Sequence, residues 1–146
     1  MKPDLALFEF FREIAIIQQL SSTLLSQNLP GGLHSSHFGV ISHLINVGEG
    51  RTPAAIASAF QVTKATMTNT LTKLSAAGYI KLEPNPEDGR SKLVYLTEAG
   101  RQFHGNAIGS LGPMMAKLQA DLDVSALLAM LPKLQELRRY LDAARD

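Results

Sequence analysis

Apolar residues recur along this chain mostly at the three- and four-residue steps of amphipathic helices, which predicts a mainly helical protein. A long first helix is expected over residues 4–28, where apolar side chains fall on several faces. Such a helix needs packing partners on more than one side. A second helix is expected to start at a cap formed by Ser35 or Ser36 and to end at Gly48 and Gly50.

Residues 52–78 carry two shorter helical patterns separated by a turn. Thr52 is expected to cap the first helix, with Pro53 at its first position, where a missing N–H costs nothing. Thr63 is expected to cap the second, which ends at Gly78. The buried stripe of this second helix follows the spacing i, i+4, i+7 and consists of Met67, Leu71 and Leu74.

Two β-prone runs follow, and they predict a hairpin. The first begins near Tyr79 and the second covers residues 93–96. The join between them contains the turn formers Asn85, Pro86, Asp88 and Gly89. We expect the tip to carry Arg90 and Lys92 into solvent. Helix, turn, helix and hairpin together form a winged helix-turn-helix, within a lobe expected to span residues 35–100.

The remaining chain is expected to be helical with several interruptions. Thr97 can cap a helix that breaks near Gly112 and Pro113, and a leucine seam follows, in which Pro132 bends or restarts the helix. The first and last helices hold more apolar surface than a small winged domain can cover. We therefore expect a homodimer built by residues 4–28 and 113–146, with residues 101–112 as a connecting helix. The predicted fold is one domain, mainly α with a small β-hairpin wing.

Polar residues of the second short helix lie off its buried stripe and predict a DNA-binding surface. Short polar side chains reach base edges in a major groove, while lysines meet phosphates. An Arg on the protruding wing, Arg90, suits the minor groove, and a salt bridge to Asp88 or Glu87 would order it. The helical residues of this surface are Lys64, Thr66, Thr68, Asn69, Thr72 and Lys73.

Composition narrows the class of protein. The net charge is only +1, but residues 50–82 hold four basic residues and no acidic one, so positive charge is local. The absence of cysteine excludes disulfides, thiolate metal sites, a cysteine nucleophile and thiol redox sensing. No run of about 20 apolar residues that could span a bilayer is present, and no signal peptide is seen, so a cytoplasmic location is expected.

The sequence gives no positive sign of catalysis, of a cofactor or of a metal. No Ser/His/Asp order, phosphate-binding glycine loop or carboxylate pair stands out, so an enzyme is not expected. The four histidines, His34, His37, His43 and His104, lack the spacing of a specific metal signature. Surface or core roles are the expectation for them.

The run from Thr52 to Gly100, which ends in EDGRSKLVYLTEAG, resembles the MarR (multiple antibiotic resistance regulator) family of bacterial transcription factors. Its most specific part is the wing, with Asp88, Gly89, Arg90 and Ser91 before LTEAG. The resemblance implies a homodimer that places a recognition helix in the major groove and a wing in the minor groove of a pseudo-palindrome. It implies a regulator, and a repressor is the form expected here. A winged-helix protein-interaction module without DNA binding is the alternative.

The resemblance also implies roles for individual residues. Thr66, Thr68 and Asn69 would contact bases or phosphates, and Lys64, Thr72 and Lys73 would bind the backbone. Arg90 would enter the minor groove with Asp88 orienting it, and Ser91 and Lys92 would complete the wing contacts. The family often has Arg where Asn69 stands. Members often release DNA when a small aromatic ligand enters a pocket, for which Phe11, His37, His43 and Phe103 are the candidates here.

Overall fold

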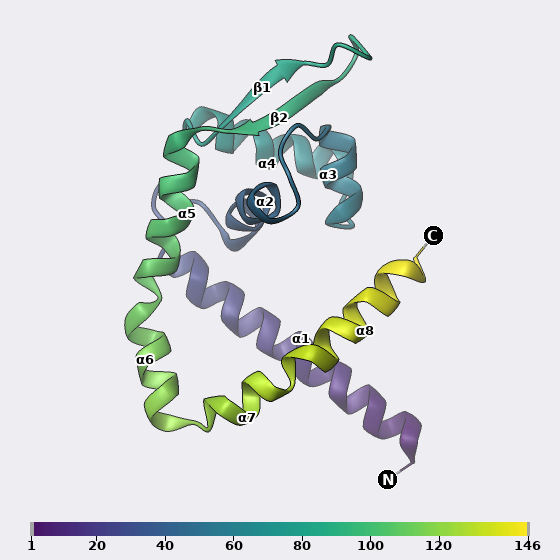
Figure 1. Cartoon of the computed structure of the whole chain (residues 1–146), viewed down its shortest axis with the longest axis vertical. Coiled ribbons are helices and arrows are strands. Elements are labelled where there is room, and N and C mark those ends of the chain that lie inside the picture. The colour runs from purple at the N-terminus through teal and green to yellow at the C-terminus, as the bar shows by residue number, and fades with distance from the viewer. Residues whose placement is uncertain (1, 146) are drawn as a thin grey trace. The chain divides into compact units, whose positions relative to one another are not determined.

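The computed structural model describes residues 2–145, which fold into two compact units divided between Ser110 and Leu111. Figure 1 shows the order of the elements along the chain. The first unit contains α1 Pro3–Gln27, α2 Ser35–Asn46, α3 Pro53–Ala59, α4 Lys64–Ala76, β1 Ile80–Pro84, β2 Lys92–Leu96 and α5 Glu98–Ser110. The second contains α6 Gly112–Asp121, α7 Val124–Ala129 and α8 Leu131–Ala143. The predicted winged helix-turn-helix is confirmed.

The caps of the two short helices are those predicted from the sequence. The Thr52 side chain accepts a hydrogen bond from the Ala55 N–H at 3.1 Å, and Thr63 accepts one from the Thr66 N–H at 3.1 Å. Each bond satisfies a donor that the first turn of a helix leaves free. Gly78 follows the end of α4 with φ of 80°, a left-handed conformation that a glycine adopts without steric cost.

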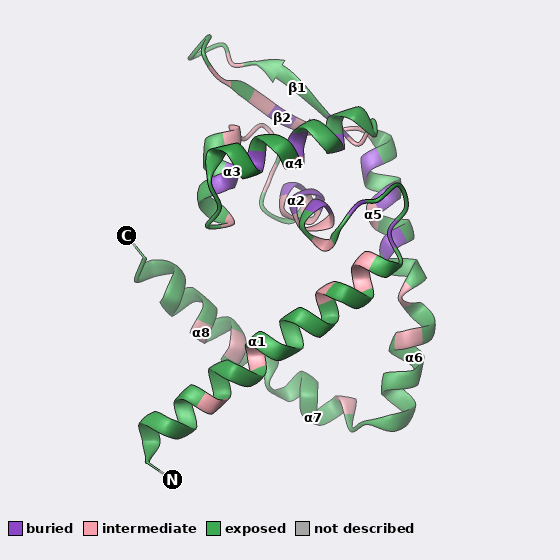
Figure 2. Ribbon diagram, turned by 180° about the vertical axis from the view of Figure 1, so that it is seen from behind, coloured by how far each residue is buried: buried purple, intermediate pink, exposed green. Residues whose placement is uncertain are grey.

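The core of the winged lobe is small and draws on every element from α2 to α5. Met67, Leu71 and Leu74 of α4 are buried as predicted, with exposed fractions of 3%, 2% and 0%. They belong to one cluster with Ile41 of α2 and Ile56 of α3. Figure 2 shows buried residues on α2, α3, α4, α5 and β2, whereas α1 and α6 to α8 are largely exposed. The lobe is therefore the part of the described chain that has a hydrophobic core.

The wing is an antiparallel hairpin in which Ile80 pairs with Leu96 and Pro84 pairs with Lys92. Arg51 extends the pairing beyond the hairpin, because its carbonyl accepts from the Val94 N–H at 2.9 Å. The Gly50 N–H donates to the Val94 carbonyl, also at 2.9 Å. The segment before α3 is thus attached to β2, which fixes the base of the wing against the helix-turn-helix.

The predicted cap of α2 is wrong in position. The helix begins at Ser35, and His34 is its N-cap residue. The His34 N–H donates to Nδ1 of His37 at 2.9 Å, while the Ser35 N–H donates to the Ser26 hydroxyl at 2.8 Å. A histidine ring at the third helical position and a serine of α1 therefore accept from the first two N–H groups at the start of this helix.

The predicted breaks in the last third of the chain are confirmed. The helix α5 ends at Ser110, and α6 begins at Gly112 just before Pro113. The leucine seam is divided at Met130, so that Pro132 lies in the first turn of α8, where its missing N–H costs little. Among the described residues, none of the helices combines the length and apolar character needed to cross a bilayer.

The wing joins α5 through a close backbone contact that requires Gly100. The Thr97 N–H donates to the Tyr79 carbonyl at 3.1 Å, and the Gly100 N–H donates to the Thr97 hydroxyl at 3.1 Å, so Thr97 caps α5 as predicted. A Cβ atom on Gly100 would overlap that same Tyr79 carbonyl oxygen. The junction between wing and helix therefore accepts no side chain at this position.

We expect Gly100→Ala to lower the free energy of unfolding by roughly 2 kcal/mol or more, because the backbone itself must move to make room. The measurement is chemical denaturation. Gly105→Ala is the matched control on the same helix, since nothing lies within 4 Å of its Cβ position. That control should be neutral or stabilise by up to about 1 kcal/mol. Equal effects of the two substitutions would contradict the close contact.

Candidate nucleic-acid interface

The side of α4 opposite its buried stripe faces solvent. At 100° per residue, seven exposed residues lie within a quarter turn of the direction opposite the stripe. Thr66 and Lys73 lie toward one edge of this side, and the other five are Ala65, Thr68, Asn69, Thr72 and Ala76. We call these five residues the outer face of α4. Three of them were predicted as DNA contacts from the sequence, whereas Ala65 and Ala76 were not, because alanine carries no polar group to attract notice. The outer face is uncharged.

The threonine hydroxyls of α4 are bonded to their own helix. Thr68 donates to the Lys64 carbonyl at 2.9 Å, and Thr72 donates to the Thr68 carbonyl at 2.8 Å. Thr70, which is half-buried, does the same toward Thr66 at 3.1 Å. Threonine in a helix commonly makes this bond four residues back. The sequence indicated polar side chains here, and the structure adds that their donors are already used.

The predicted cations of α4 lie at the margins of the outer face. Lys64 is exposed in the first turn. The ammonium group of Lys73, on the other margin, donates to the Gly32 carbonyl at 2.9 Å, and so connects α4 to the loop between α1 and α2. This contact joins residues 41 positions apart, which the local sequence pattern could not indicate. Lys81 on β1 pairs with Glu83 at 3.2 Å.

The wing tip presents one strongly exposed cation. The Arg90 side chain is 95% exposed, and its Nε lies 3.5 Å from Oδ1 of Asp88, the salt bridge considered from the sequence. The same oxygen accepts from the Arg90 N–H at 3.0 Å. Ser91 receives a hydrogen bond from the Asn85 side chain at 2.9 Å and closes the loop behind it. Lys92 is exposed at the start of β2, and the exposed Glu87 and Asp88 balance the two cations, so the tip has no net charge although Arg90 is accessible.

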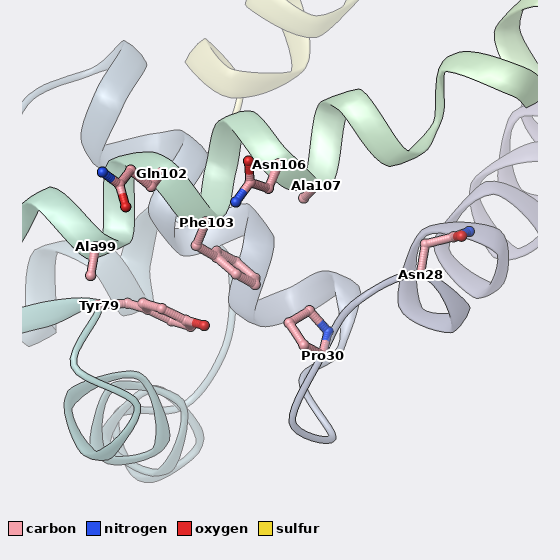
Figure 3. Close-up of a pocket in the computed structure, with 8 residues that line it drawn as sticks. All are labelled: Asn28, Pro30, Tyr79, Ala99, Gln102, Phe103, Asn106 and Ala107. Carbon is pink, nitrogen blue, oxygen red and sulfur yellow. The ribbon is translucent and has the colours of Figure 1, made fainter.

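A pocket of about 280 Å³ lies within the first unit, beside α5. The rings of Tyr79 and Phe103 stack at 4.5 Å along one wall (Figure 3). Of the four residues proposed from the resemblance, Phe103 lines this pocket, whereas Phe11, His37 and His43 do not. Phe11 is 37% exposed on α1. The full lining consists of Asn28, Pro30, Tyr79, Ala99, Gln102, Phe103, Asn106 and Ala107.

His34 and His37 lie close together, with ring centroids 5.9 Å apart, whereas His43 and His104 each pack against a phenylalanine. His37 is 7% exposed, and burial lowers its pKa, with Lys73 and His34 adding to the shift. Burial also lowers the pKa of His43, with a contribution from Arg51, and its ring packs edge-on against Phe60 at 5.3 Å. His104 stacks on Phe38 at 4.9 Å. Within residues 2–145 no group of three His, Asp or Glu side chains has a geometry that could hold a metal ion.

Comparison with known proteins identifies similar chains. A family model described as the MarR family matches residues 31–91. An uncharacterised HTH-type transcriptional regulator of Mycobacterium bovis is 30% identical over 87 residues, so the chain spans about 60% of that relative's length, and the match covers 60% of this chain.

Solved structures extend the likeness over more of the chain. Wild-type MarR from E. coli matches 84% of this chain and 93% of its own, with 26% identity and a TM-score of 0.74. A mutant of E. coli MarR complexed with operator DNA matches 92% of this chain and 99% of its own, with 24% identity and a TM-score of 0.67. The likeness of fold therefore includes the helices on both sides of the winged lobe.

We expect acid to destabilise the fold partly through His37. Its folded-state pKa is lowered, so the unfolded chain binds the proton more readily, and this contribution to stability is complete above about pH 6.5 and is lost as the pH falls. Protonation would also remove the acceptor that Nδ1 offers to the His34 N–H. His37→Gln cannot titrate but keeps an acceptor, so its unfolding free energy should fall less between pH 7 and 5.

Denaturant titrations at several pH values measure this dependence. His43→Gln is the comparison variant. It removes the other histidine whose pKa is lowered and keeps His37 titratable, so the contributions of the two histidines can be separated. If His37→Gln showed the same pH dependence as the parent chain, His37 would not be a source of acid sensitivity.

Proposed function

We propose that this chain is a member of the MarR family and a regulator of transcription that binds double-stranded DNA. The observation that carries the proposal is the orientation of α4. Its apolar stripe is buried, while Thr68, Asn69 and Thr72 on its outer face are exposed. An exposed helix of this kind fits a major groove, and Arg90 on the wing fits the neighbouring minor groove.

The remaining contacts follow from this placement. Lys64 and Thr66 lie near the start of α4, where they would meet the phosphate backbone. Lys73 is exposed but bonded to Gly32, so we assign it to holding the α1–α2 loop as well as to the backbone contact. Asp88 orders Arg90, and Ser91 and Lys92 complete the wing. The E. coli protein of similar fold has been crystallised with operator DNA, which supports this mode of binding.

We further propose that the protein is a homodimer on a pseudo-palindromic operator. No residue of α1, α6, α7 or α8 is buried among those that the structure describes. Phe8 and Leu20 of α1 are 64% and 62% exposed, and Leu141 of α8 is 48% exposed. Apolar surface of this extent is typical of helices that pack against a second subunit. Two subunits would present two copies of α4 to the two half-sites.

Repression with release by a small aromatic effector is the form of regulation that we propose. A dimer contacts both half-sites at once, so a ligand that changes the spacing of the two α4 helices would weaken binding. The stacked rings of Tyr79 and Phe103 in the pocket beside α5 support an aromatic ligand. A protein that binds the chromosome in this way would be cytoplasmic. The relatives named as transcriptional regulators give an enzymatic role no support.

Selection of bound fragments from a sheared genome tests the proposal. We expect the purified chain to enrich an inverted repeat whose half-sites lie about one helical turn apart. Binding that enriches no sequence and falls steeply with salt would reduce the function to general DNA coating. No binding at low salt, by a dimer free of ligand, would favour the winged-helix interaction module instead.

Arg90→Ala should weaken binding to the selected operator without affecting the fold, since the side chain is 95% exposed. Loss of one cationic contact per half-site should make the slope of log K against log salt concentration less steep by about 1 for each wing. Fluorescence anisotropy over a series of salt concentrations measures both effects. Lys117→Ala, which removes a positive charge from α6, outside the winged lobe, is the control and should leave the slope unchanged. An unchanged slope for Arg90→Ala would remove the wing from the interface.

Phe8→Glu should shift the protein from dimer to monomer. A substitution at Phe8 occurs once in each subunit and so changes the proposed interface twice. The dimer dissociation constant should therefore rise at least about a hundredfold. Sedimentation equilibrium at several protein concentrations gives this constant. Gln19→Glu places the same charge at an exposed polar position of α1 and should dimerise normally. A Phe8→Glu chain that remained fully dimeric would exclude this part of α1 from the interface.

A further inference from the structure

The chemistry that α4 offers to a base is limited by its own hydrogen bonds. Thr68 and Thr72 donate their hydroxyl protons to the Lys64 and Thr68 carbonyls, at 2.9 and 2.8 Å. A hydroxyl has a single proton to donate, so each of these side chains keeps only acceptor capacity. Neither can donate to the O6 and N7 acceptors that guanine presents in a major groove.

The same bonds leave methyl groups as the outward part of the surface. A threonine whose oxygen turns back onto its helix directs its Cγ2 methyl away from that carbonyl. Ala65 adds a third methyl one turn before Thr68 and Asn69, and all are exposed. In a major groove, apolar groups of this size match the C5-methyl of thymine. The threonines of the outer face therefore present methyl groups, whereas their residue type had suggested hydroxyl donors.

The one free hydrogen-bonding side chain of the outer face is Asn69. Its amide has a donor and an acceptor side by side, which match N7 and N6 of adenine. Guanine is most often read by Arg or Lys and cytosine by Asp or Glu, and Lys73 is the only one of these on the side of α4 opposite its buried stripe. Lys73, at the margin, is held by the Gly32 carbonyl.

From these observations we propose that α4 reads A·T pairs at the centre of each half-site. The methyl groups of Ala65, Thr68 and Thr72 contact thymine methyls, and Asn69 pairs with adenine. This inference rests on the proposed function, because it requires α4 to lie in a major groove. It goes further by naming the base pairs that are read and by assigning specificity to methyl contacts.

The experiment uses the full chain and the half-site recovered from a randomised duplex pool. We expect A·T pairs at the positions facing α4. Replacing one of those thymines by uracil removes only its methyl group, and affinity should fall roughly threefold to fivefold for each contacted thymine. Asn69→Ala should cost between about fivefold and a hundredfold and relax the preference for adenine.

Matched variants at one position separate methyl from hydroxyl contacts. Thr72→Ser removes the methyl and keeps the hydroxyl, whereas Thr72→Val keeps a methyl and removes the hydroxyl. We expect Thr72→Ser to bind more weakly and to lose its response to uracil at the contacted position, while Thr72→Val binds and responds like the parent chain. The position is exposed, so thermal melting should confirm that each variant is folded. Thr68→Ser and Thr68→Val repeat the comparison one turn earlier.

The outcomes distinguish this inference from the proposed function. A·T pairs at the centre, with uracil effects that disappear in the Thr→Ser variants, support both. An enriched inverted repeat with G·C pairs facing α4, or with affinity unchanged by uracil, would overturn the methyl readout and leave the proposed function standing. Failure to enrich any sequence would overturn the proposed function itself.

Discussion

The burial of one stripe of α4 is the constraint on which the winged lobe depends. Met67, Leu71 and Leu74 occupy a core that also holds Ile56 of α3 and Val94 of β2, both fully buried. A helix with 3.6 residues per turn that buries one stripe must turn the opposite stripe toward solvent. The outer face is therefore positioned by the same contacts that stabilise the lobe, and it needs no separate support. The packing beneath this surface therefore decides which side chains it exposes.

The described chain divides its apolar side chains between a core and an uncovered surface. Elements α2 to α5 contribute the buried core, although Leu82 and Ile108 are exposed, whereas α1 and α6 to α8 have no buried residue. Charge is also distributed unevenly along the chain. The net charge is only +1, but residues 50–82 contain basic residues and no acidic one. A second subunit would cover the first kind of surface and DNA would neutralise the second. Neither feature adds to the hydrophobic core of the winged lobe.

Much of the lobe was predictable because its determinants are local. Caps at Thr52 and Thr63, the stop at Gly78 and the stripe of α4 depend on neighbours within one or two turns. What escaped prediction depends on contacts between distant segments, as when Lys73 reaches Gly32. It also includes a helix start one residue earlier than expected, where the His37 ring accepts from the His34 N–H. The hydroxyl bonds of α4 are local and were predictable in principle. We interpreted the threonines as hydrogen-bond donors to DNA, although their hydroxyl groups donate to carbonyls of the same helix.

We propose that two copies of α4 lie in successive major grooves of one DNA site. The chain has no cysteine, so Ala76→Cys places a single thiol at the exposed end of the outer face, beyond the proposed base contacts, and an iron chelate coupled there cleaves nearby DNA. We expect two symmetric clusters of cleavage on the selected operator, with centres about 10 base pairs apart. A single cluster, or cleavage spread evenly along the fragment, would contradict it.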